Sequence, residues 1–157
     1  MDYWKAPHIS KIYEALTAIA DSRFKMISVN SAKCYSSSGN KFYSIEYNPL
    51  TNAIMSNDNT AWFTDSVSYP MVGFLMLKGK IAYDANTAKL LKGIKWKDIN
   101  KKFKNDYDKT VEYELGFLKE RGIDIEPIKT EIEKIYNSII HMKLSKLGAK
   151  QFPPKGY

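Results

Sequence analysis

The residues with the clearest chemical capacity are lysines crowded into one part of the chain. Residues 78–104 hold nine lysines and two aspartates, so this segment carries a net charge of +7, equal to that of the whole protein. Crowded ammonium groups bind phosphates in a salt-sensitive, sequence-tolerant way. We therefore predict a basic binding module that contacts nucleic acid or another polyanion. Its candidate nucleic-acid-binding residues are Lys89, Lys92, Lys95, Lys97, Lys101 and Lys104.

Two features of the charge pattern leave other interpretations open. Arg23 and Arg121 are the only arginines among 24 basic residues. Arginine is the residue that most often contacts base edges, and it binds a phosphate through two parallel hydrogen bonds. Lysine alone also suits simple solubility. Residues 105–141 carry a net charge of −4. The first alternative is therefore a protein-interaction or self-assembly module, including a homo-oligomer, that uses opposed basic and acidic patches.

Few residues suit acid–base or covalent chemistry. His8 and His141 belong to different predicted helices, and no motif links them to each other or to Cys34, the single cysteine. The polar loop with Asp58 and Asp65 opens the second alternative, an enzyme with a pocket near these carboxylates. This loop lacks the central glycine and closing glutamate of a calcium hand. The sequence assigns no catalytic residue, no metal ligand and no cofactor.

The serine run from Ser36 to Lys41 has the composition of a phosphate cradle but not its spacing. It lacks the G-x-x-x-x-G-K-[ST] pattern, and predicted strands flank it on both sides, with no helix following. We therefore predict a turn between two strands.

Composition limits the compartment and the number of domains. One cysteine cannot form an internal disulfide, which favours a reducing cytoplasmic compartment. The longest apolar run, residues 71–77, is too short to cross a bilayer, so no membrane partner is expected. A chain of 157 residues with 44% apolar residues predicts a single α+β domain over 1–147 and a C-terminal tail over 148–157.

The spacing of apolar residues predicts the order of the elements. We expect a helix over 7–21, an antiparallel meander of three or four strands over 24–56, a buried helix over 69–79 and a short helix from Asp84 to Leu91. Gly73 lies inside the buried helix, where its missing side chain allows another element to come close.

The longest periodic pattern runs from Trp96 to Arg121, with apolar steps of three or four residues throughout. It predicts one long helix with Lys97, Lys101 and Lys104 on its polar face. A last helix is expected after Asp124, joined by a short connection. The predicted fold is therefore α+β: an N-terminal helix, a small antiparallel meander and a helical half that ends in a long antiparallel helix hairpin.

Residues 35–79 resemble a SWIM-type ββα module in the order and spacing of their elements. The matching segments are 42–47, 54–56 and 69–72, followed by the apolar helix residues 74–77. The family carries zinc ligands as Cys-x-Cys and Cys-x-His, and this chain has none of them. The resemblance implies binding to DNA or protein without the metal.

Overall fold

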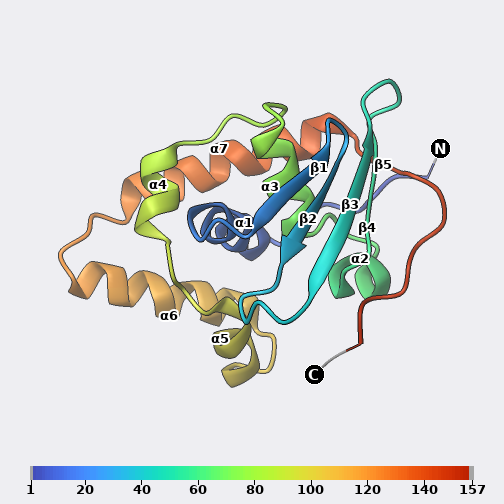
Figure 1. The fold of residues 1–157 in the computed structure, drawn as a ribbon. Helices are drawn as coiled ribbons and strands as arrows, with labels where there is room; N and C mark the ends of the chain where they lie inside the picture. Colours follow the sequence, from blue (N-terminus) through green and yellow to red (C-terminus); the bar gives the residue numbers. More distant parts are fainter. Residues whose placement is uncertain (1, 156–157) are drawn as a thin grey trace.

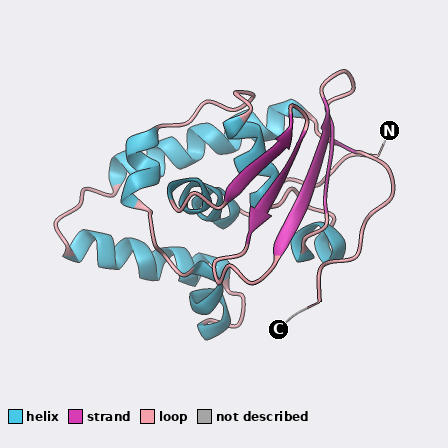
Figure 2. Cartoon of the chain, in the orientation of Figure 1, coloured by secondary structure: helices cyan, strands magenta, loops and turns pink. Residues whose placement is uncertain are grey.

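The computed structural model describes residues 2–155 as two layers, a sheet and a set of helices packed mainly on one face of it (Figures 1 and 2). In chain order the elements are α1 (Ser10–Ala20), β1 (Phe24–Ser28), β2 (Ser31–Tyr35), β3 (Phe42–Asn48), β4 (Ala53–Ser56), α2 (Asn59–Thr64), α3 (Tyr69–Leu77), α4 (Ala85–Leu90), α5 (Trp96–Lys102), α6 (Tyr107–Glu120), α7 (Glu126–Met142) and β5 (Ser145–Lys146). This order confirms the predicted α+β class.

The sheet has the strand order β1-β2-β3-β4-β5. The first four strands pair antiparallel, as the meander prediction requires, and β5 adds to β4 in parallel. Tyr43, Ile45 and Tyr47 on β3 are buried while their neighbours along the strand are more exposed. This alternation is typical of an antiparallel sheet with one covered face. The short β5 was not predicted, because two residues carry no readable alternation.

The helix layer is centred on α1 and α3, which pack on each other. Ile12 and Leu16 of α1 are fully buried. The helix begins at Ser10 rather than at Pro7, because Nδ1 of His8 accepts the backbone N–H of Ser10 at 3.0 Å. A methyl group on Gly73 of α3 would lie 2.3 Å from the ring of Phe24, so the predicted close approach is made by β1.

The prediction of one long helix over Trp96–Arg121 is wrong. The chain forms α5 and α6 instead, separated by residues 103–106. Lys104 and Asn105 adopt the left-handed φ values of 52° and 64°, which end a right-handed helix. The side chain of Asp106 then accepts the N–H of Lys109 at 3.3 Å and starts α6. Lys104 therefore lies outside the helical face that it was expected to share with Lys97 and Lys101.

The last two helices follow one another in opposite directions, as predicted (Figure 1). Both helices contact α1, which lies between them. The predicted hairpin, in which the two helices pack directly against each other, is corrected in this respect. At the start of α7, Asp124 accepts the N–H of Glu126 at 3.1 Å, so it supports the helix one position before the capping residue Ile125.

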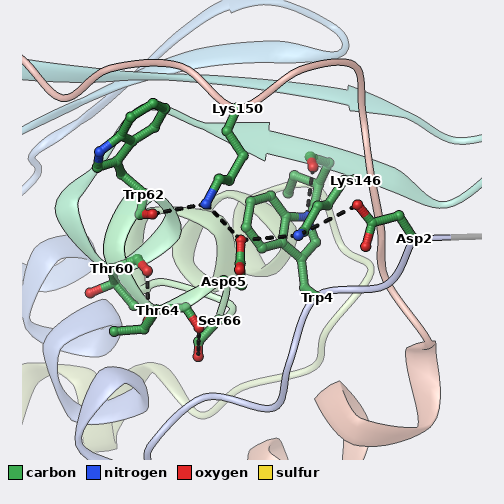
Figure 3. Close-up of polar contacts among 10 residues, drawn as sticks. Asp2, Trp4, Thr60, Trp62, Thr64, Asp65, Ser66, Lys146 and Lys150 are labelled. Atoms are coloured by element: carbon green, nitrogen blue, oxygen red, sulfur yellow. Dashed lines mark hydrogen bonds and ion pairs between the residues drawn. The ribbon is translucent and has the colours of Figure 1, made fainter.

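Asp65 forms ion pairs with the C-terminal segment and, through Lys146, is linked to the N-terminal segment (Figure 3). Its Oδ1 lies 2.8 Å from Nζ of Lys150 and 3.0 Å from Nζ of Lys146, and Lys146 also reaches Oδ2 of Asp2 at 3.5 Å. Hydrogen bonds first from Lys150 and then from Lys146 lower the pKa of Asp65 to about 2. This carboxylate therefore stays ionised well below neutral pH.

The C-terminal segment lies against α2, a helix that was expected to be a loop. The rings of Trp62 and Phe152 are 4.3 Å apart, and Nζ of Lys150 donates to the carbonyl of Trp62 at 2.9 Å. Asp58 begins α2 by accepting the N–H of Ala61 at 2.8 Å. A six-residue helix has too few turns to show a period, which explains why the sequence pattern did not predict it.

Candidate functional site

A cavity of about 420 Å³ opens where the β2–β3 loop meets α1 and α5. Figure 1 shows this loop and α5 at the same end of the sheet. The volume falls within the ~300–1,000 Å³ of small-molecule sites. Seven segments of the chain supply its walls: α1, the turn before β1, the β2–β3 loop, β3, the start of α2, the start of α3, and the region from 94 to 107.

The lining of the cavity is strongly cationic. Five positive side chains and two carboxylates, Glu14 and Asp58, contribute to it, which leaves a net charge of +3. The positive side chains are those of Lys11, Arg23, Lys41, Lys97 and Lys101. Charge of one sign in a concave, low-dielectric wall focuses the electric field and attracts a counter-ion. The cavity is therefore suited to an anionic group.

Lys41 differs from the other cations in being buried without a carboxylate partner among the described residues. It is only 9% exposed, and within residues 2–155 no carboxylate oxygen lies within 4.0 Å of its ammonium. Burial, and secondarily the positive charge of Lys97, lowers the pKa of Lys41. A buried charge is normally paired, so an anion from outside the chain would supply what Lys41 lacks.

The predicted turn between β2 and β3 holds Lys41 in this position. The N–H of Gly39 donates to the carbonyl of Ser36 at 2.8 Å, and the N–H of Ser36 donates to the carbonyl of Lys41 at 2.9 Å. Ser36 and Ser37 line the cavity beside the lysine. The turn prediction is confirmed, and the structure adds that this turn forms one wall of the site.

A second charged pair lies on α1. Lys11 and Glu14 are three residues apart, 7% and 8% exposed, with Nζ of Lys11 at 3.1 Å from Oε2 of Glu14. The ammonium of Lys11 also lies 4.1 Å from the ring centre of Tyr107. The Lys11 charge is therefore compensated within the protein, unlike that of Lys41.

Arg23 enters the cavity from the turn before β1. Its Nη1 donates to the carbonyl of Tyr35 at 3.3 Å, and its guanidinium carbon lies 5.6 Å from the ring centre of Tyr69. Tyr43 meets Tyr69 edge-on, with ring centres 6.5 Å apart. Burial raises the pKa of Tyr43 to about 12 and the pKa of Tyr69 well above its ordinary value. Both phenols are therefore neutral at pH 7 and form part of the cavity wall.

The structure brings two of the six predicted lysines into this site. Lys97 and Lys101 line the cavity together with Asn100, from positions on one face of α5. The other predicted residues, Lys89, Lys92, Lys95 and Lys104, are exposed and lie outside the lining. Trp96, the first residue of the predicted periodic pattern, is buried, and its Nε1 donates to Thr17 Oγ1 at 2.8 Å.

The two aspartates predicted to flank a pocket are separated. Asp58 borders the cavity, but its Oδ1 accepts the Ala61 N–H and its Oδ2 accepts the Ser68 hydroxyl at 2.5 Å. Asp65 forms ion pairs with the C-terminal lysines described above. The expectation of one pocket beside both aspartates is therefore corrected: only Asp58 borders the cavity, and both of its oxygens are already engaged.

His8 lies in a Ser-His-Asp arrangement that closes the start of α1. Its Nδ1 is 2.9 Å from Ser10 Oγ, and its Nε2 is 2.9 Å from Asp108 Oδ1. The hydroxyl of Ser10 cannot meet a substrate, because the residue is 1% exposed. The arrangement therefore links α1 to α6 rather than forming a nucleophilic site. His141 lies near the end of α7, exposed, with Nδ1 at 2.7 Å from the Asn137 carbonyl.

Sequence reasoning missed Lys11, Glu14, Arg23 and Lys41 as members of one site. Their separation along the chain gives no local pattern. Lys11 and Glu14 lie on the face of the first helix opposite its apolar stripe, where the period predicts exposure, although the fold buries both.

Among residues 2–155, no three His, Cys, Asp or Glu side chains gather as ligands for a metal ion. None of the helices over the same residues combines the length and apolar character that crossing a bilayer requires.

The fold and the cavity together define the class: an α+β protein with a cationic pocket at one end of its sheet. The family model described as "Uncharacterised conserved protein UCP014422" matches residues 4–145, and the chain belongs to this family. The matched span includes every residue that lines the cavity. No curated protein and no solved structure matches the chain.

Proposed function

We propose that the protein is a binding module for phosphate-bearing ligands, and that the cavity receives a phosphate of a nucleotide or of a nucleic-acid strand. The observation that carries the proposal is Lys41, a lysine that is more than nine-tenths buried and has no carboxylate within 4.0 Å among the described residues. Lys97 and Lys101 line the same cavity and add charge of the same sign.

The physical reason is the free energy of an uncompensated buried charge. The ammonium group of a largely buried lysine loses part of its hydration, and a second ammonium nearby adds repulsion. Both effects lower the pKa of Lys41. A phosphate in the cavity would reverse them, because it supplies a negative charge and acceptor oxygens. The free protein therefore favours an anion over a neutral ligand at this position.

The exposed lysines outside the cavity favour a nucleic-acid strand as the ligand. Lys89, Lys92 and Lys95 precede α5, and Lys104 follows it. Freely hydrated lysines contribute to affinity mainly through the release of counter-ions from a strand. In this proposal the cavity holds one phosphate firmly, and the outer lysines contact neighbouring phosphates loosely.

The test is the fluorescence anisotropy of a labelled single-stranded oligonucleotide, titrated with the protein at several salt concentrations. We expect the affinity to fall steeply between about 50 and 200 mM salt. The variant Lys97→Gln/Lys101→Gln should bind about tenfold more weakly, and its slope of log affinity against log salt should be smaller by about 1. Lys41→Gln should weaken binding by a similar factor.

A charge-matched control separates the cavity from a general loss of positive charge. Lys129→Gln/Lys134→Gln removes two lysines from α7, which supplies none of the residues lining the cavity. This control should bind within about twofold of the unaltered protein. Equal weakening by the two double variants, or no binding at the lowest salt, would refute the proposed cavity.

A further inference from the structure

Buried polar atoms without hydrogen-bond partners gather at the cavity. Within residues 2–155 there are five such side-chain atoms, and three belong to residues of the lining: Glu14 Oε2, Arg23 Nε and Asn100 Oδ1. A polar atom that is removed from water without a partner costs free energy, and such atoms are rare in native proteins. Glu14 Oε2 has an ion pair with Lys11 at 3.1 Å and Arg23 Nε lies 4.0 Å from Asp21 Oδ2, so what these two atoms lack is a hydrogen bond and not a charge partner. The concentration of such atoms at one cavity indicates a ligand that adds hydrogen bonds.

The chemistry of these atoms constrains the ligand further than the lysines do. Glu14 can only accept hydrogen bonds when ionised, and its Oε2 makes none although Lys11 Nζ lies 3.1 Å away. Asn100 adds a second acceptor, from a side chain that is also 8% exposed. A phosphate offers acceptors, not donors, at neutral pH. A ligand that satisfies these acceptors carries hydroxyl or amino groups in addition to its phosphate.

The aromatic wall adds a third requirement. Tyr69 and Tyr107 are the half-buried rings of the lining, and each has a cation against it. The distances from the ring centres are 5.6 Å to the Arg23 guanidinium carbon and 4.1 Å to the Lys11 ammonium. Tyrosine rings and arginine planes are surfaces on which nucleobases stack. A flat, unsaturated group matches this wall better than a saturated sugar alone.

We propose that the ligand of the cavity is a ribonucleotide, either free or at the end of an RNA strand, and that Glu14 accepts a hydrogen bond from its ribose. This inference rests on the proposed function, since it assumes that Lys41, Lys97 and Lys101 hold the phosphate. The ribose 2′-hydroxyl is the donor that distinguishes RNA from DNA, and carboxylates accept from ribose hydroxyls in other nucleotide sites. Glu14 is then the residue that determines specificity.

The experiment is calorimetric titration of the full-length protein at low salt with four probes: AMP, 2′-deoxy-AMP, ribose 5-phosphate and inorganic phosphate. We expect AMP to bind most tightly and 2′-deoxy-AMP at least tenfold more weakly, because a hydrogen bond to a charged acceptor is lost. Ribose 5-phosphate should bind more weakly than AMP, because it lacks a base to stack. This comparison uses the unaltered protein, so it does not depend on any variant folding.

The variant Glu14→Gln tests the assigned residue with two opposite readouts. The preference for AMP over 2′-deoxy-AMP should fall by at least threefold, because the neutral amide is a weaker acceptor. The affinity for inorganic phosphate should rise, because a negative charge leaves the cavity. A residue that only supports the fold would lower both affinities together. Circular dichroism and a thermal melt establish that the variant is folded.

The outcomes separate the inference from the proposed function. Equal affinity for AMP and 2′-deoxy-AMP, or an unchanged preference in folded Glu14→Gln, would overturn the ribonucleotide assignment while leaving phosphate binding intact. Failure of all four probes to bind would overturn both proposals. Competition of a 5′-phosphorylated RNA hexamer with AMP supports the strand-end form. If AMP alone binds, the free-nucleotide form is supported.

Discussion

Replacing Gly73 by alanine should destabilise the protein, and the effect should change sign when Phe24 is shortened. The added methyl carbon would lie 2.3 Å and 2.6 Å from two ring carbons of Phe24. Ordinary carbon contacts are about 3.5–4.0 Å, so the ring or α3 must move by more than an ångström. Overpacking of this kind costs about 1–3 kcal/mol. Alanine also gains about 1 kcal/mol over glycine inside a helix. The net expectation is a loss of about 1 kcal/mol.

The assay is a double-mutant cycle of the unaltered protein, Gly73→Ala, Phe24→Leu and the double variant, followed by tryptophan fluorescence in urea. In the Phe24→Leu background the obstructing ring is gone, so Gly73→Ala should stabilise the protein by about 1 kcal/mol. The coupling free energy is then about 2 kcal/mol. In thermal melts, the loss in the unaltered background corresponds to a Tm about 2–4 °C lower. Equal effects of Gly73→Ala in both backgrounds would refute the packing argument.

Three further predictions concern groups outside the cavity. Asp65→Asn should speed proteolytic cleavage at Phe152, because Lys146 and Lys150 lose their shared charge partner; cleavage at an unchanged rate would contradict this anchoring. The pKa of Asp65 is lowered to about 2 from 3.8, so its stabilising contribution is complete above pH 3.8 and is lost as the pH falls through about 2, which an acid titration of tail cleavage would follow. Cys34 is fully buried, and burial raises the pKa of its thiol to about 12, so it should resist a thiol reagent at pH 8 until urea unfolds the chain. Rapid labelling of the native protein would contradict that burial.

Local patterns in the sequence predicted the elements whose signals lie within one stretch of chain. The meander, the turn at 36–41, the buried helix with Gly73 and the short helix capped by Asp84 were all predicted, and the Asp84 cap is seen as a hydrogen bond from the Asn86 N–H at 3.1 Å. The resemblance to SWIM-type modules remains a prediction.

The apolar period gave a wrong prediction at residues 103–106, where the chain changes direction but its apolar side chains stay packed together. Phe103 precedes the break between α5 and α6 and Tyr113 follows it, yet their ring centres are 5.3 Å apart. A period that continues through a turn looks like one helix. Lys104 and Asn105 both adopt left-handed φ values. Asn105 was the sequence indication of a helix end, because asparagine adopts this conformation more readily than most residues.

The cavity could be predicted only in part, because its walls come from segments far apart in the sequence. The lysine cluster gave the sign of the charge and two of the lining residues, Lys97 and Lys101. Lys41 looked like one residue of a turn. Its isolation from carboxylates appears only once the β2–β3 loop lies against α5, a relation set by the whole fold.

The measurement that tests the cationic cavity most directly is the titration of Lys41 itself. Reductive methylation with ¹³C-formaldehyde labels every lysine for NMR, and a Lys41→Arg variant identifies the signal that belongs to Lys41. Because burial and Lys97 lower its pKa, this signal should titrate at lower pH than those of the other lysines. Saturating AMP should raise that pKa, since the phosphate favours the charged amine. A Lys41 signal that titrates with the exposed lysines and does not respond to AMP would contradict the account.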